Sequence, residues 1–282
     1  MSEVRRLLVG YDGSPGGDDA LELARLLATI EGVSVLVVSV LPYGPLPVTY
    51  ALLAEEQEAE AAPLLDKARE KLAGLEVETR AYGGGSPAGV INDLAEQEEV
   101  DLIVVGSPHR GPIGRALIGS VAEGLLHGAP CAVSAAPRGY GSAEHKPFGT
   151  IAVAYDGTPE AKLALAHGRR LAESTGGNLR ILTVISPPVA LPGVVGYTPT
   201  MPPDAEQINA RAVSEASSGV DAEGQVLSGP AATTLAEASE GGVDLLIAGS
   251  RHYGPVTRVL LGSVSSLLIH KAPCPVLVVP RP

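Results

Sequence analysis

This sequence contains no tryptophan, one phenylalanine and only two cysteines among 282 residues. Its cores therefore have to be built from Val, Leu, Ile and Ala. We expect Cys131 and Cys274 to be small buried apolar residues, and nothing in the sequence supports a disulfide between them. No apolar run is long enough to span a membrane, and the N-terminus lacks the apolar stretch of a signal peptide. These absences predict a cytoplasmic protein with no membrane partner.

Basic residues are scarce as well: 20 Lys and Arg stand against 32 Asp and Glu, which gives a formal net charge of -12. This balance argues against a nucleic-acid partner, because binding the phosphate backbone requires a basic surface. It does not exclude a nucleotide, because backbone amides bind phosphate without Lys or Arg. The length fits two domains better than one.

The chain repeats itself once. RRLLVGYDGSP (5–15) matches GTIAVAYDGTP (149–159), and VDLIVVGSPHRGP (100–112) matches VDLLIAGSRHYGP (243–255). The join falls in a stretch rich in Gly, Pro and polar residues, as expected of a linker. We therefore predict a first domain over residues 1–138, a linker over 139–148 and a second domain over 149–282.

Within each repeat, short apolar runs alternate with segments that have apolar residues at helical spacing. In the first repeat we expect strands near 7–11, 33–40, 77–82, 101–107 and 131–136, and helices that begin at GSPGG and cover 51–73, 87–98 and 116–127. This alternation predicts an α/β fold with two doubly wound domains, each built on a parallel sheet. In such sheets ligands bind beyond the carboxyl ends of the strands, where the strand order reverses.

Two Gly-Ser pairs occur at equivalent places in each repeat, the first after a strand and the second before a helix. They are Gly106-Ser107 and Gly119-Ser120, then Gly249-Ser250 and Gly262-Ser263. Glycine lets the backbone approach a ligand closely, and a helix start offers free N–H groups to phosphate. The alternative is structural: the second pair ends a loop and its serine caps the helix.

Asp12 and Asp156 follow the first strand of each repeat, within the sequence YDG. An Asp in this setting forms turns readily. At the same sheet edge as the Gly-Ser pairs, each is also a candidate contact to a ribose or a base. Either carboxylate could hold Mg²⁺ through water, but we expect no second carboxylate near it.

The ends of the repeats, LIGSVAEGLLHGAPCAV and LLGSVSSLLIHKAPCPVLVVP, carry a resemblance. The chain resembles the universal stress protein family in its tandem form, over essentially its whole length. The resemblance implies a five-stranded parallel sheet in each unit, of the adenine nucleotide alpha hydrolase-like type, with the units packed as a pseudo-dimer. It also implies binding of ATP, with or without Mg²⁺, by the ATP-binding members' motif of Gly, two residues, Gly, nine residues, then Gly followed by Ser or Thr.

In that motif the first glycine corresponds to Gly106 and Gly249, and the last pair to Gly119-Ser120 and Gly262-Ser263. The resemblance implies that Val40 and Val184 hold adenine through their backbone. The resulting candidate site residues are Tyr11, Asp12, Val40, Gly106, Ser107, His109, Gly119, Ser120 and Val121, and Tyr155, Asp156, Val184, Gly249, Ser250, His252, Gly262, Ser263 and Val264.

The middle glycine of the motif is replaced by His109 and His252. Three alternatives remain open for this position. A histidine tolerates a positive φ better than most residues, so the loop could keep its form. The imidazole could itself donate to a phosphate. Alternatively, the sites have changed to another ligand or to none.

We find no P-loop, no Cys/His cluster with metal-ligand spacing and no nucleophile with a partnered base. We therefore expect no dedicated enzyme, and at most slow, incidental ATP hydrolysis. The function that we expect is a stress-response or signalling module that binds an adenine nucleotide and acts on an unknown protein partner. The alternative is a nucleotide-independent scaffold. The edges of the fifth strands (131–136 and 274–280) are candidates for a homodimer contact.

Overall fold

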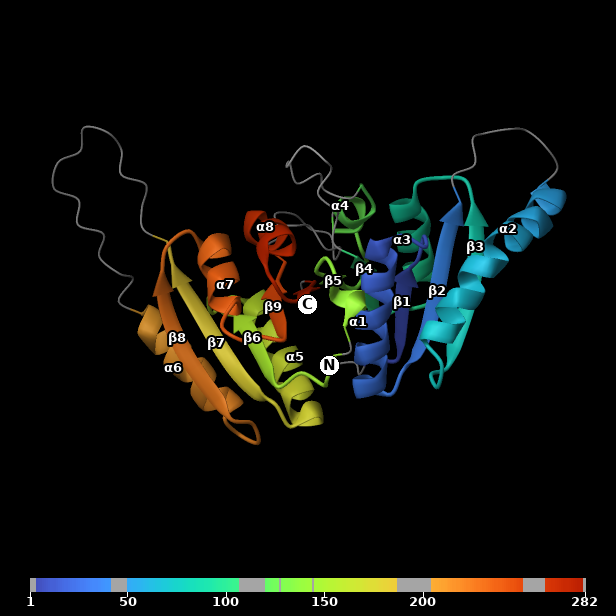
Figure 1. Ribbon diagram of the computed structural model, residues 1–282. Helices are drawn as coiled ribbons and strands as arrows, with labels where there is room; N and C mark the ends of the chain where they lie inside the picture. The colour runs from blue at the N-terminus through green and yellow to red at the C-terminus, as the bar shows by residue number, and fades with distance from the viewer. Residues whose placement is uncertain are drawn as a thin grey trace, which may run out of the picture. The chain divides into compact units, whose positions relative to one another are not determined.

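The computed structural model describes residues 4–41, 50–106, 120–126, 128–143, 145–186, 204–250 and 262–280. The chain forms two compact units that divide between Pro147 and Phe148. We call them unit 1 and unit 2. Figure 1 shows both.

Unit 1 is a five-stranded parallel sheet with the strand order β3-β2-β1-β4-β5. Its elements are β1 (Arg6–Gly10), α1 (Pro15–Glu31), β2 (Ser34–Leu41), α2 (Tyr50–Lys71), β3 (Val77–Gly83), α3 (Pro87–Gln97), β4 (Leu102–Gly106), α4 (Ser120–Leu126), β5 (Ala132–Ala136) and the 3₁₀ turn η1 (Tyr140–Ser142). Helix α1 contacts α2, and α3 contacts α4. Figure 1 shows α1 and α2 in front of the strands of unit 1.

Unit 2 repeats this arrangement, with the parallel order β8-β7-β6-β9-β10. Its elements are β6 (Thr150–Ala154), α5 (Pro159–Thr175), β7 (Asn178–Ile185), α6 (Ala205–Ala216), β8 (Ala222–Ser228), α7 (Ala231–Ser239), β9 (Leu245–Gly249), α8 (Ser263–Lys271) and β10 (Val276–Val279). The prediction of two α/β units with five parallel strands each is confirmed.

The strand order reverses beside the first strand of each unit. In unit 1 the chain passes from β1 to β2 and β3 on one side, and β4 pairs on the other side of β1. The carboxyl ends of β1 and β4 therefore border the point where a doubly wound sheet binds its ligand. In unit 2, β6 and β9 take these places.

The central strands are buried on both faces, which explains their continuous apolar runs. In β1 the residues Leu7, Leu8 and Val9 are fully buried, and β9 buries Leu245, Leu246 and Ile247 equally. Cys131 and Cys274 are free and buried, as predicted. Burial raises the pKa of each thiol to about 12, so neither is a thiolate at neutral pH. No helix in the described part of the chain is long and apolar enough to cross a membrane.

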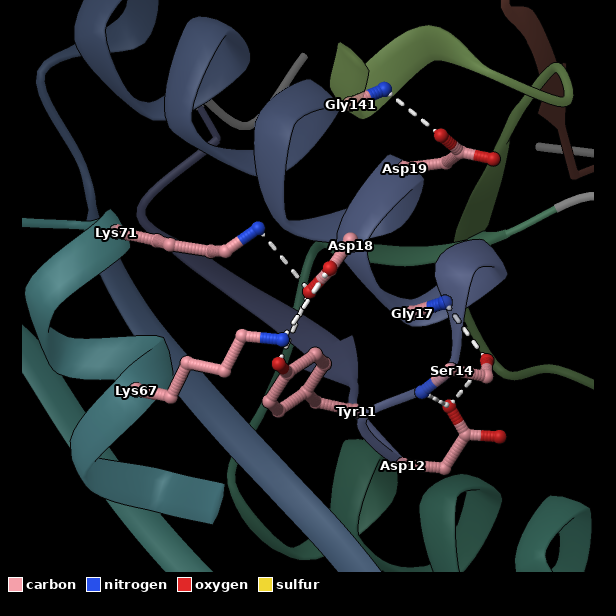
Figure 2. Close-up of polar contacts among 9 residues, drawn as sticks. All are labelled: Tyr11, Asp12, Ser14, Gly17, Asp18, Asp19, Lys67, Lys71 and Gly141. Carbon is pink, nitrogen blue, oxygen red and sulfur yellow. Dashed lines mark hydrogen bonds and ion pairs between the residues drawn. The ribbon is translucent and has the colours of Figure 1, made fainter. Parts of the chain in front are cut away.

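The segment that follows β5 packs against α1 within unit 1. The buried carboxylate of Asp19 accepts hydrogen bonds from the backbone N–H groups of Gly139 (3.0 Å) and Gly141 (2.7 Å). Figure 2 shows the contact with Gly141. A Cβ at Gly141 would lie only 2.7 Å from the carbonyl oxygen of Asp18, so this position requires glycine. The predicted linker therefore begins with a turn that is docked on α1.

One half-buried histidine in α5 gives unit 2 a pH-dependent contribution to stability. His167 in α5 occupies the position that the fully buried Leu23 holds in α1. Burial, reinforced by the charge of Arg170, lowers the pKa of His167 to about 4. In the unfolded chain the same imidazole titrates near 6.5, at about the ordinary value. As the pH falls from 6.5 to 4, the unfolded chain therefore takes up a proton that the folded unit does not bind.

We expect the free energy of unfolding of unit 2 to fall by about 2 kcal/mol between pH 8 and pH 5 because of this histidine. The variant His167→Leu should lose most of that pH dependence, since it places the unit 1 residue in the same position. Urea denaturation at the two pH values measures the difference. If His167→Leu lost as much stability between pH 8 and pH 5 as the native chain does, groups other than His167 would be responsible for the pH dependence.

Candidate functional site

The turn after the first strand has the same geometry in both units. In unit 1, Oδ1 of Asp12 accepts hydrogen bonds from the backbone N–H (3.0 Å) and the hydroxyl (2.6 Å) of Ser14, as Figure 2 shows. Ser14 in turn caps α1 by accepting from the N–H of Gly17. In unit 2, Oδ1 of Asp156 makes the same two contacts with Thr158 (3.1 and 2.6 Å). Each Asp thus has the turn-forming role at the carboxyl end of the strand.

Tyr11 is bound into a separate network in unit 1. Its hydroxyl donates to the carboxylate of Asp18 (3.0 Å), which also pairs with Lys67 (3.3 Å) and Lys71 (3.1 Å) of α2. Burial raises the pKa of Tyr11. Burial also raises the pKa of Asp18, but hydrogen bonds from Lys71, Tyr11 and Lys67 outweigh it and hold that pKa below its usual value. Figure 2 shows Tyr11 and Asp12 pointing to different sides of the chain.

The glycine that ends the fourth strand of each unit lies against the first turn of the first helix. A Cβ on Gly106 would lie 2.5 Å from the carbonyl carbon of Gly16. A Cβ on Gly249 would lie 2.7 Å from the Cβ of Glu160 and 2.9 Å from its carbonyl carbon. Separations this short do not occur for real side chains, so packing alone requires glycine at both positions.

A pocket opens at the strand ends of unit 2. Its lining comes from β6 and the following turn, α5, β7, α7, β9 and α8, namely Ala154, Tyr155, Asp156, Thr158, Glu160, Ala161, Leu182, Val184, Ala231, Leu235, Ala248, Gly249, Gly262, Val264 and Ser265. Leu182, Val184 and Leu235 contribute apolar side chains to this lining. The enclosed volume of about 80 Å³ is well below the roughly 300–1,000 Å³ of pockets that enclose a whole ligand. The described residues therefore surround only part of a nucleotide-sized molecule.

The start of α8 also lines this pocket, through Gly262, Val264 and Ser265. Gly262 is the N-cap residue, with φ -70° and ψ 155°, and no side chain of the described residues caps the helix. The first N–H groups of α8 lie at the positive end of the helix dipole. Ser263 is the first helical residue rather than the cap. Ser265 donates its hydroxyl to the carbonyl oxygen of Gly249 (3.2 Å), which holds α8 at the end of β9.

Comparison with known proteins identifies the family. The universal stress protein family model matches residues 3–137 and again residues 147–280. The chain belongs to the universal stress protein family. A universal stress protein of Mycobacterium tuberculosis is 29% identical over 97% of this chain and 99% of its own length. A single-unit relative from Thermus aquaticus is 33% identical over 47% of this chain and 98% of its own length.

Solved structures agree on the fold. A universal stress protein from Archaeoglobus fulgidus superposes with a TM-score of 0.78 at 24% identity, covering all of both chains. A universal stress protein described as putative, from Pseudomonas aeruginosa, superposes with a TM-score of 0.61 at 18% identity, covering 99% of this chain and 94% of its own. These two structures support the α/β architecture of this universal stress protein.

In unit 2 the structure brings most of the predicted site residues together. The pocket is lined by Tyr155, Asp156, Val184, Gly249, Gly262 and Val264. Ser263 is exposed at the start of α8. Ser250 is fully buried, and its hydroxyl has no hydrogen-bond partner among the described residues.

In unit 1, Tyr11, Asp12 and Gly106 lie at the ends of the central strands, Val40 near the end of β2, and Ser120 and Val121 at the start of α4. The remaining candidates, Ser107, His109, Gly119 and His252, lie outside the described residues. The predicted roles of these residues in ligand binding stay predictions.

The structure adds residues that the sequence analysis missed. The sequence analysis singled out no second acidic residue beside Asp156, and Glu160 lines the same pocket. A signal was available, since Glu160 is the second residue of the helix that begins three residues after Asp156. Leu182 could also have been found, two residues before Val184 and so on the same face of the strand. Leu235 of α7 had no local signal, because only packing brings that helix to the strand ends.

Proposed function

We propose that this universal stress protein binds an adenine nucleotide at the strand ends of its units and acts as a stress-response or signalling module. The observation that carries the proposal is the pocket of unit 2, whose lining combines apolar side chains with the start of α8. A flat apolar surface suits a purine ring, and free N–H groups at a helix start suit a phosphate. Both halves of a nucleotide thus find a complementary surface across one pocket.

ATP is the ligand that we propose, delivered with Mg²⁺. Asp156 and Glu160 are the side chains of this pocket that would hold the cation, since carboxylate oxygens are suitable ligands for Mg²⁺. No group of three His, Cys, Asp or Glu residues in the described ranges is placed to hold a metal by itself. The cation would therefore be shared with the phosphates. We assign no dedicated catalytic role to these residues, and hydrolysis of ATP would be slow and incidental.

We expect MgATP to stabilise protein that has been stripped of bound nucleotide. At a ligand concentration of about 100 times Kd, the free energy of unfolding of the binding unit rises by about 2.7 kcal/mol. Calorimetric titration measures the stoichiometry, and the thermal midpoint measures the stabilisation. Ala231→Phe, which fills the pocket from α7, should abolish binding in unit 2, whereas Ala210→Phe on the exposed face of α6 should not.

The variant His109→Gly, His252→Gly belongs in the same titration, because it restores the family's motif at both positions. No binding by the native chain together with binding by this variant would mean that the histidines closed the ATP site. Absence of binding in both proteins would contradict the proposal. The nucleotide-independent scaffold would then be the better interpretation.

A further inference from the structure

A second pocket lies in unit 1, beside α1. Its volume of about 560 Å³ falls within the range of roughly 300–1,000 Å³ that is typical of small-molecule sites. None of the residues described at its wall is a candidate for nucleotide binding. They come from α1, the end of α2 and the segment after β5, namely Asp18, Leu21, Glu22, Arg25, Lys71, Gly141 and His145.

The residues from α1 form one stripe along that helix. Asp18, Leu21, Glu22 and Arg25 follow one another at intervals of three, one and three residues, so they share one face. Leu21 is almost fully buried and gives the pocket an apolar part. The rest of the lining is polar or charged, which points to a polar ligand.

The lysines beside this pocket outnumber the carboxylate that they share. The ammonium groups of Lys67 (3.3 Å) and Lys71 (3.1 Å) both pair with Asp18, as Figure 2 shows. One carboxylate neutralises only one of the two lysines. Glu22, the other carboxylate of the lining, is held by Arg25 through Nε (2.9 Å) and Nη2 (2.7 Å). The wall around Lys71 therefore has an excess of positive charge.

The groups of this wall are held in place by contacts within unit 1. The contact with Asp18 uses one of the three N–H groups of the Lys71 ammonium, which leaves donors for a second acceptor. Nε2 of His145 donates to the carbonyl oxygen of Tyr140 (2.7 Å), and the two rings are stacked with their centroids 3.6 Å apart. Gly141 is fixed by its hydrogen bond to Asp19. Binding to such a wall orders few groups and so costs little entropy.

We infer that this pocket binds a small organic anion with two or more acidic groups, a polycarboxylate or a phosphorylated compound. One acidic group lies on the half-buried ammonium of Lys71, where a charge-assisted hydrogen bond is strong. The site belongs to unit 1 alone, because Lys162 and Ala166 stand in α5 where α1 has Asp18 and Glu22. The inference goes beyond the proposed function and does not depend on it.

The test is a titration of the full chain without Mg²⁺, followed by the methyl resonances of Leu21, which lines the pocket. The probes are citrate, pyrophosphate and, as a cation of similar size, spermidine. We expect saturable shifts with at least one of the two anions, and none with spermidine. The anion that binds more tightly distinguishes a polycarboxylate from a phosphorylated ligand. In Lys71→Gln we expect the affinity for that anion to fall about tenfold or more.

Arg69→Gln is the matched control. It removes a positive charge from the same last turn of α2, where Arg69 pairs with Asp66 and does not line the pocket. We expect this variant to bind the anion with an affinity within about twofold of the native value, because residues two apart on a helix do not face each other.

The segment after β5 provides a second measurement, because Gly141 and His145 belong to the wall. A bound anion should slow trypsin cleavage after the exposed Arg138 about threefold or more in the native chain, and not in Lys71→Gln. Three results would each overturn the inference: no shift of Leu21 with either anion, an equal loss of affinity in Arg69→Gln, or equal shifts with spermidine. None of them bears on MgATP binding in unit 2, which is measured separately.

Discussion

Replacing Gly106 with alanine should destabilise unit 1 by about 3 kcal/mol, the upper end of the range for overpacked sites, or by more. The added Cβ would lie 2.5 Å from the carbonyl carbon of Gly16 in the first turn of α1. Backbone atoms cannot move aside as the end of a side chain can. Removing this clash therefore requires α1 to shift away from β4. Such a shift also disturbs the other residues of α1, which pack on the sheet.

Gly89→Ala is the control for this substitution. Gly89 lies exposed in α3, where the nearest atom to an added Cβ is 3.8 Å away. Alanine there should be neutral or stabilise the unit by up to about 1 kcal/mol, because it is the better helix former. Chemical denaturation of both variants compares the two effects. A loss of less than about 1 kcal/mol for Gly106→Ala would contradict the packing argument.

This expectation bears on how the family's motif is interpreted. Its first glycine, Gly106 or Gly249, is required by the contact with the first helix in each unit, whether or not a ligand binds. Loss of ATP binding in a variant of Gly106 would therefore report a damaged fold. Ligand contacts are tested more directly at the start of α8 and at Glu160, where side chains line the pocket.

Replacing Asp19 with alanine should release the segment after β5 and cost about 3 kcal/mol or more. Two hydrogen bonds to a buried carboxylate are lost, each worth about 1.5–3 kcal/mol. The N–H groups of Gly139 and Gly141 would then lack their acceptor. Arg138 is exposed beside this turn, so trypsin cleavage after Arg138 should become about tenfold faster or more.

The neighbouring variant Asp18→Ala separates this effect from a general loss of charge in α1. The carboxylate of Asp18 forms ion pairs with Lys67 and Lys71 and accepts a hydrogen bond from the hydroxyl of Tyr11. None of these partners belongs to the segment after β5. Its removal should leave the cleavage rate at Arg138 close to that of the native chain. Equal acceleration in both variants would show that Asp19 has no special role in holding the turn.

Local patterns in the sequence determined the architecture. The repeat of YDGSP as YDGTP predicted two equal units, and in both turns the Ser or Thr hydroxyl donates a hydrogen bond to the Asp carboxylate. The buried strands were predicted because a strand covered on both faces must be apolar throughout. The location of the candidate site at the strand ends was predicted as well, because the carboxyl ends of parallel strands lie at one edge of the sheet. All of these features depend on residues that are close together in the chain.

Only the tertiary structure decided which distant residues meet. Nothing near Gly106 in the sequence shows that α1 presses against it, and nothing near Leu235 shows that α7 forms a wall of the pocket. Glu160 looks like an ordinary first-turn residue that favours a helix start, and packing places it in the same pocket as the start of α8. Such contacts join segments from different elements, and their geometry depends on how side chains fill the space between helix and sheet. No local periodicity encodes that geometry.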